Sequence, residues 1–164
     1  MSAPYKAPLT DIRFALYDVL GVEPLFQRLG YPEATRGILD GVVGEAGGFS
    51  ETVPARPNSV GAAVATTLDK APGKVTTPPG FKAAYAQFVE GGWTGLTASP
   101  DFGGQGLPHT MGVPLNELVN ASNLAWGNFP LLSHGAVEAL KHHGEAWQQE
   151  VFLKPLVDGR WTGT

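Results

Sequence analysis

The sequence contains no cysteine, and few of its 164 residues are charged. Without cysteine the chain can form no disulfide, no thiolate nucleophile and no cysteine-based zinc or iron–sulfur site. Charged residues make up only 16% of the chain, and 11 basic against 15 acidic side chains give a formal net charge of −4. A weakly acidic chain without a basic stripe is poorly suited to nucleic acid or to an anionic membrane surface, so we expect neither as a partner.

Long apolar runs are also absent. No run approaches the roughly 18 residues that a membrane-spanning helix needs, and the first eight residues lack the basic-then-apolar layout of a signal peptide. We therefore expect a cytoplasmic protein with no membrane span. Hydrophobic residues still make up 43% of the chain and aromatic residues 10%, which is enough for the core of one ordinary domain.

Apolar residues recur at helical spacing in six stretches. In the first stretch, Ile12, Leu16 and Leu20 fall on one face, with Thr10 as the expected N-cap and Gly21 as the expected end. The other five cover residues 32–47, 79–91, 111–124, 130–143 and 145–156, and the first two of these begin with a proline. The spacing predicts an all-α fold, a helical bundle of about six helices.

Two segments interrupt this pattern. Prolines and glycines punctuate residues 53–79, which we expect to form a long irregular connection with at most a short helix or strand over residues 61–68. The last five residues, 160–164, have the composition of a strand, and we expect one there.

No catalytic or metal-binding motif is recognisable. The four histidines, His109, His134, His142 and His143, form no HExxH pair, and the two adjacent ones point about 100° apart on a helix. No serine lies in a GxSxG motif, and no carboxylate pair at helical spacing sits on an apolar face. The glycine-rich turn 103–106 fits neither GxGxxG nor a Walker loop. We therefore predict no catalytic residue and no metal site in this chain.

Residues 126–130, Trp-Gly-Asn-Phe-Pro, form an aromatic-rich stretch beside a predicted helix. Aromatic side chains in such a position are most often core, and composition alone favours that interpretation. The alternative is that they line an apolar cavity.

Several short motifs follow one another in a characteristic order. They are FVEGGWTGL at residues 88–96, PDFGGQGLP at 100–108, NEL at 116–118, FLKPLVDG at 152–159 and RWTGT at 160–164. This order resembles the N-terminal helical domain of the acyl-CoA dehydrogenase family, up to the first strand of its middle β domain. The opening residues 5–14 resemble the extra N-terminal segment of a subgroup that includes 3-methylmercaptopropionyl-CoA dehydrogenases and broad-range bacterial fatty acyl-CoA dehydrogenases.

The resemblance implies a domain layout and a reaction. Residues 1–30 would form an N-terminal extension, 31–159 the helical N-terminal domain, and 160–164 the start of a truncated middle β domain. The full-length enzyme would use FAD to oxidise an acyl-CoA to its trans-2-enoyl form, with a glutamate base from a C-terminal helical domain and electron-transfer flavoprotein as the acceptor. Because this chain ends before those groups, we expect it to be an inert fragment that binds no FAD alone and forms a homo-oligomer.

By the same resemblance, Trp126, Phe129 and Leu131 would line a wall of the acyl pocket, where each buried CH₂ gains about 0.8 kcal/mol. A function of a different class also fits the residues: a free-standing helical interaction module that never meets flavin. A reading frame that continues past Thr164 into a Thr-Glu-Pro strand would favour the dehydrogenase over the module.

Overall fold

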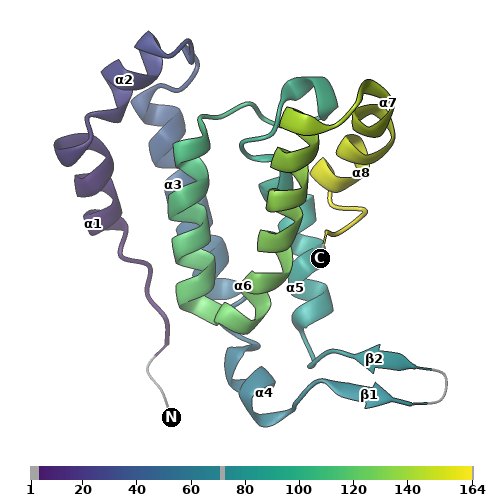
Figure 1. The fold of residues 1–164 in the computed structure, drawn as a ribbon. Coiled ribbons are helices and arrows are strands. Elements are labelled where there is room, and N and C mark those ends of the chain that lie inside the picture. The colour runs from purple at the N-terminus through teal and green to yellow at the C-terminus, as the bar shows by residue number, and fades with distance from the viewer. Residues whose placement is uncertain (1–3, 71–72, 164) are drawn as a thin grey trace.

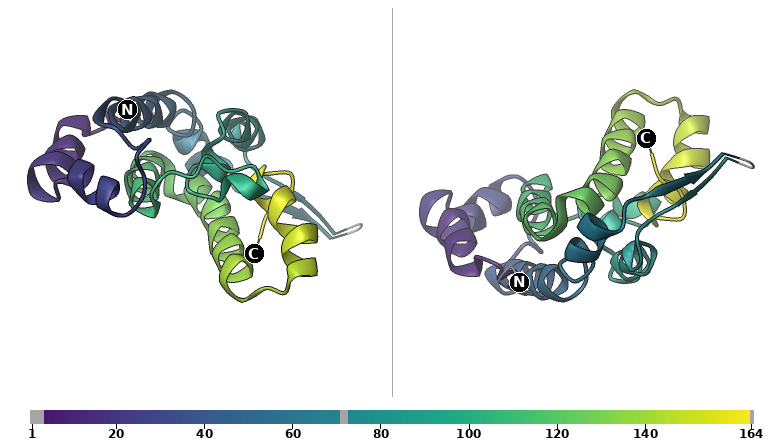
Figure 2. Two further views of the ribbon diagram at one scale, coloured as in Figure 1. Left: turned by 90° about the horizontal axis from the view of Figure 1, so that it is seen from above. Right: turned by 90° about the horizontal axis from the view of Figure 1, so that it is seen from below.

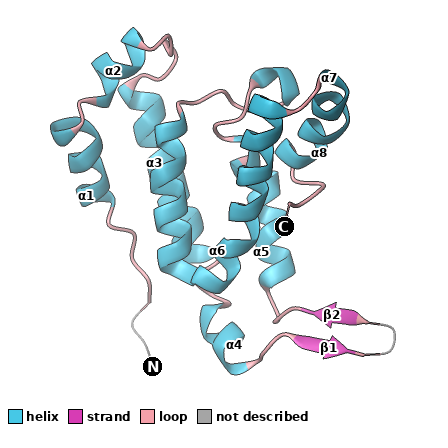
Figure 3. Cartoon of the chain, in the orientation of Figure 1, coloured by secondary structure: helices cyan, strands magenta, loops and turns pink. Residues whose placement is uncertain are grey.

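The structure is a computed structural model that describes residues 4–70 and 73–163, and within these the chain is almost entirely helical (Figures 1 and 3). The predicted all-α fold is confirmed. No helix in the described residues combines the length and apolarity of a membrane-spanning segment. The elements are α1 (Leu9–Arg13), η1 (Phe14–Val19), α2 (Val22–Arg28), α3 (Arg36–Thr52), α4 (Asn58–Ala63), β1 (Thr67–Asp69), β2 (Lys74–Thr76), α5 (Phe81–Glu90), η2 (Trp93–Gly95), η3 (Pro100–Phe102), η4 (His109–Met111), α6 (Gly112–His143), α7 (Ala146–Gln148), η5 (Gln149–Leu153) and α8 (Lys154–Val157).

The longest element, α6, folds back on itself. At Asn123 its backbone leaves the helical conformation, with φ −162° and ψ 90°, and Figure 1 shows its two halves rising as separate arms from one corner. The first half lies beside α3, and the second half packs against η5 and α8. The sequence predicted two helices here, but the second begins directly after Asn123 and includes Pro130 in its interior.

Asn123 explains this fold-back. Its Oδ1 accepts a hydrogen bond from the backbone N–H of Trp126 at 3.1 Å, which is the geometry of a helix N-cap. Its Nδ2 donates to the carbonyl of Pro54 at 2.9 Å. Because the side chain is almost fully buried, one residue both starts the second half of α6 and fixes it to the segment that follows α3.

The buried side chains form two clusters. The larger one joins α1, η1, α2, α3, α5, the first half of α6 and Trp126 at the start of its second half, so the predicted N-terminal extension shares its core with the rest of the helices. Its largest fully buried side chains are Phe26, Leu39, Met111, Leu118 and Trp126. The smaller cluster joins the second half of α6 to η5 and α8, and consists of Ala98, Val137, Leu153, Leu156 and Val157.

Polar contacts fix α1 along α3. The Glu51 carboxylate accepts a hydrogen bond from the backbone N–H of Ala7 at 2.9 Å. One side chain of α3, Asp40, accepts hydrogen bonds from Arg13 Nε and from the Tyr17 hydroxyl, each at 3.0 Å. The chain's first helices are therefore held by directional bonds as well as by the core.

The segment 53–79, predicted to be irregular, contains a helix and a hairpin. Besides α4, the strands β1 and β2 pair antiparallel, with Thr67 opposite Thr76 and Leu68 opposite Val75. The hairpin projects away from the helices (Figures 1 and 2). The short helix or strand allowed over residues 61–68 is present, since α4 and β1 both reach into that range. The hairpin was not predicted: β-branched residues on both sides of the turn pair with each other even though prolines flank them.

The predicted C-terminal strand is absent from residues 160–163, the described part of that segment. The Trp161 N–H donates to the Pro155 carbonyl at 2.9 Å, and the Gly163 N–H donates to Ser133 Oγ at 3.0 Å. A strand needs a neighbouring strand, and here the backbone groups bond to helical residues instead.

Two predicted helix starts were displaced. α1 begins one residue before Thr10, which therefore does not cap it. α3 begins at Arg36 and not at Pro32. The residues just before α3 form a turn, in which the Ala34 N–H donates to the Tyr31 carbonyl at 3.1 Å.

Candidate functional site

An apolar groove of about 650 Å³ lies between β2, α5 and the second half of α6. This volume is in the range of small-molecule sites. The two helices supply its aromatic side chains, the hairpin closes one side, and two exposed lysines stand at the rim. The lining residues are Thr66, Lys74, Val75, Thr76, Thr77, Phe81, Lys82, Tyr85, Ala125, Trp126 and Phe129.

Trp126 forms the fixed base of this groove. Its side chain is only 2% exposed, and its indole Nε1–H donates to the carbonyl of Phe81 at 3.0 Å. It also packs edge-on against Phe88, with ring centroids 5.5 Å apart. Trp126 is therefore part of the core and also lines the groove. The sequence analysis had given these two roles as alternatives.

Phe129 is an exposed aromatic side chain that lines the groove. Its side chain is 46% exposed and meets the ring of Tyr85 edge to face, with centroids 5.0 Å apart. Burial, followed by the charge of Asp158, raises the pKa of Tyr85. Its hydroxyl stays protonated at neutral pH and donates to the Gly159 carbonyl at 3.1 Å, which holds the ring in place.

Leu131, the third predicted wall residue, does not line the groove. It is 39% exposed and follows Phe129 by two residues, about 200° around a helix, so it faces away. The sequence analysis missed Phe81 and Tyr85 as lining residues. Their four-residue spacing on α5 is the signal that places both on one helix face.

The glycine-rich loop before η4 folds by main-chain hydrogen bonds. The backbone N–H groups of residues 103–107 donate in turn to the carbonyls of Pro100, Ser99, Gly95, Ala98 and Leu96. Anion-binding loops instead point free N–H groups at a phosphate. These five are all engaged inside the loop, so it forms no cradle for the diphosphate of a nucleotide.

One group of side chains with metal-ligating atoms comes together in the described residues, which no sequence motif gave reason to expect. It consists of His109, His134 and Glu138. It lies at the junction of η4 and the second half of α6, outside the groove.

The comparison with known families decides the assignment. Residues 59–160, which include both helices of the groove, match the family model described as acyl-CoA dehydrogenase, N-terminal domain. The chain belongs to the acyl-CoA dehydrogenase family. It is 35% identical over 161 residues to the 3-methylmercaptopropionyl-CoA dehydrogenase of Ruegeria pomeroyi, an alignment that covers 98% of this chain and 27% of that protein. The chain thus spans about a quarter of the length of this acyl-CoA dehydrogenase, and the family resemblance seen in the sequence is confirmed.

Proposed function

We propose that this chain supplies the N-terminal helical domain of an FAD-dependent acyl-CoA dehydrogenase and forms one wall of its acyl pocket. The enzyme would convert an acyl-CoA thioester to the trans-2-enoyl-CoA and pass the electrons to electron-transfer flavoprotein. The observation that carries the proposal is the groove. Two of the three wall residues expected from the family resemblance, Trp126 and Phe129, line one apolar groove within the region that matches the family.

The groove is suited to binding and not to proton transfer. Its lining residues include no carboxylate and no histidine, and these are the side chains that most often abstract a proton in enzymes. Its apolar floor can gain about 0.8 kcal/mol for each CH₂ of an acyl tail that it fully buries. This domain therefore contributes substrate length selection, and we propose that it is inert when separated from the rest of the enzyme.

The glycine-rich loop offers no phosphate cradle for FAD by itself. The glycine-rich loop, the one stretch with a composition typical of phosphate binding, has its five N–H groups engaged internally. We propose that the chain alone retains no flavin, and that the FAD contacts come from other parts of the enzyme. The chain's own contribution is to shape the apolar wall and to exclude water from it.

Binding of acyl-CoAs to the chain tests this proposal. Calorimetric titration with CoA and with acyl-CoAs of increasing length should show affinity rising with length, by up to about fourfold for each CH₂ that becomes fully buried. Phe129→Ala should weaken binding of the longer acyl-CoAs by about tenfold. Phe14→Ala is the matched control, because Phe14 is an exposed phenylalanine on η1.

Two results would contradict the pocket wall. One is an affinity that does not change with acyl length, and the other is an equal loss in both variants. An absence of any binding to acyl-CoA or CoA would favour the helical interaction module instead.

A further inference from the structure

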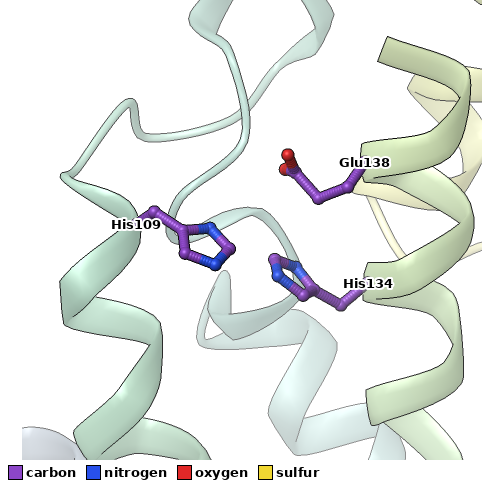
Figure 4. Close-up of side chains that lie close together, drawn as sticks. All are labelled: His109, His134 and Glu138. Atoms are coloured by element: carbon purple, nitrogen blue, oxygen red, sulfur yellow. The ribbon is translucent and has the colours of Figure 1, made fainter. Parts of the chain in front are cut away.

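Three side chains with metal-binding atoms converge where the glycine-rich loop ends. His109 comes from η4, and His134 and Glu138 occupy successive turns of the second half of α6. Figure 4 shows the two imidazole rings side by side, with the Glu138 carboxylate directed toward the same space. One ligand atom of each residue lies within 4.8 Å of those of the other two.

The two imidazole rings lie close together. The imidazoles of His109 and His134 are stacked, with centroids 5.1 Å apart and an interplanar angle of 26°. A neutral imidazole has one ring nitrogen whose lone pair can bind a metal ion.

The third side chain is also positioned for ligation. Glu138 is about a quarter exposed, and its Oε2 lies 3.4 Å from His142 Nε2, one helical turn farther on. A neighbour of this kind orients a ligating carboxylate in metal sites. His109 is exposed, so the cluster opens to solvent on that side, where water can complete the coordination.

We propose that His109, His134 and Glu138 form a binding site for a divalent first-row transition cation, with Zn²⁺ as the best match. Two imidazole nitrogens and one carboxylate oxygen suit Zn²⁺. Mg²⁺ and Ca²⁺ prefer ligand sets made only of oxygen, so this set disfavours them. In a tetrahedral site with bonds of about 2.0–2.1 Å the ligand atoms lie roughly 3.4 Å apart. The ligand atoms now lie within 4.8 Å of one another. Side-chain rotations that move these atoms by about one ångström would bring them to that spacing.

The bound cation would join two parts of the chain. His109 precedes α6, and the other two ligands lie beyond its fold-back at Asn123. A ligand that binds only the folded chain stabilises it in proportion to the logarithm of its concentration over Kd. Zn²⁺ should therefore raise the melting temperature.

Calorimetry with ZnCl₂ on the full 164-residue chain at neutral pH, after treatment with a chelator, tests the site. We expect one equivalent of Zn²⁺ with a Kd in the low micromolar range or below, and Co²⁺ should give the visible bands of a low-coordinate complex. His109→Ala and Glu138→Gln should each weaken binding by at least about tenfold. His109 is exposed, so its variant should keep the wild-type circular dichroism spectrum.

His143→Ala is the matched control. His143 is an exposed histidine at the end of the same helix, outside the cluster, and its loss should change Kd by less than about twofold. The site is refuted if Zn²⁺ binds no tighter than about 100 µM. It is refuted equally if His109→Ala binds as the wild type does. None of these outcomes depends on acyl-CoA, so they are distinct from a failure of the proposed function.

Discussion

At the scale of single residues, Asn123 determines where α6 folds back. Replacing it by alanine removes an N-cap and leaves the buried Pro54 carbonyl without its donor. We expect Asn123→Ala to lower the free energy of unfolding by about 2–4 kcal/mol. Urea unfolding measures this change. Asn128→Ala, at an exposed position of the same helix, should stay within about 0.5 kcal/mol of the wild type, and equal losses in the two variants would contradict the capping role.

Tyr17 makes the stability depend on pH in the alkaline range. Burial, followed by its hydrogen bond to Asp40, raises the pKa of Tyr17 from 10.0 to about 12. Between these values the unfolded chain releases a proton that the folded chain keeps. Stability is therefore fully present below pH 10 and is lost as the pH rises toward 12.

Replacing Tyr17 by phenylalanine removes the contribution of Tyr17 to this dependence, while Tyr5 and Tyr85, whose pKa values are also raised, keep theirs. We expect Tyr17→Phe to show a shallower decline of unfolding free energy than the wild type across pH 10–12, measured by urea titration at several pH values. Tyr31→Phe serves as the control, because Tyr31 is an exposed tyrosine. A wild-type decline that Tyr17→Phe leaves unchanged would show that Tyr17 is not its source.

At the scale of elements, the C-terminal helices depend on a core of their own. Leu153 is 1% exposed in the smaller cluster, and Leu153→Ala should cost about 2–4 kcal/mol. Because the loss is local, hydrogen exchange should accelerate first in η5 and α8. Val151→Ala is the control at a 49% exposed position, and uniform acceleration over the whole chain would contradict a separate cluster.

The predictable elements are those whose signal is local. α5 was placed from the spacing of its own apolar residues, and the stretch 146–157 forms a continuous helical run across three elements, close to the predicted 145–156. The hairpin was missed because its stability comes from the partner strand, which no period within either strand reveals. The fold-back of α6 was placed only roughly, since Asn123 acts through a carbonyl 69 residues away.

The candidate site divides in the same way. The family resemblance pointed to Trp126 and Phe129, and both line the groove. Leu131 follows Phe129 by two residues, so helix geometry alone predicts that it faces away from Phe129. The pair His109 and His134 shows no motif spacing, because the loop and the fold-back bring them together only in three dimensions. Such a cluster is found from tertiary structure alone.

At the scale of the whole molecule, apolar side chains remain on the surface in number. Phe14, Val19 and Leu20 are exposed near the N-terminus, and Leu132 and Trp161 are exposed at the other end of the chain. With only 16% charged residues, little repulsion keeps two copies apart. We expect the chain to self-associate at micromolar concentration, so light scattering should report a mass above 17.3 kDa. A concentration-independent monomer would contradict this expectation.

The glycine-rich loop holds its path without help from most of its side chains, and this has a consequence for how its sequence can change. Its N–H groups bond to carbonyls, so the exposed position 101 can diverge between relatives while the backbone stays where it is. Position 105 is more restricted, because Gln105 Nε2 donates to the Gly92 carbonyl at 3.0 Å. The glycines are the exceptions: a Cβ at position 104 would collide with the Ala98 carbonyl, and positions 103 and 106 have φ angles of 89° and 69°, which favour glycine. The loop is thus a fixed main-chain path in which three glycines must be kept and the exposed side chain at position 101 can change.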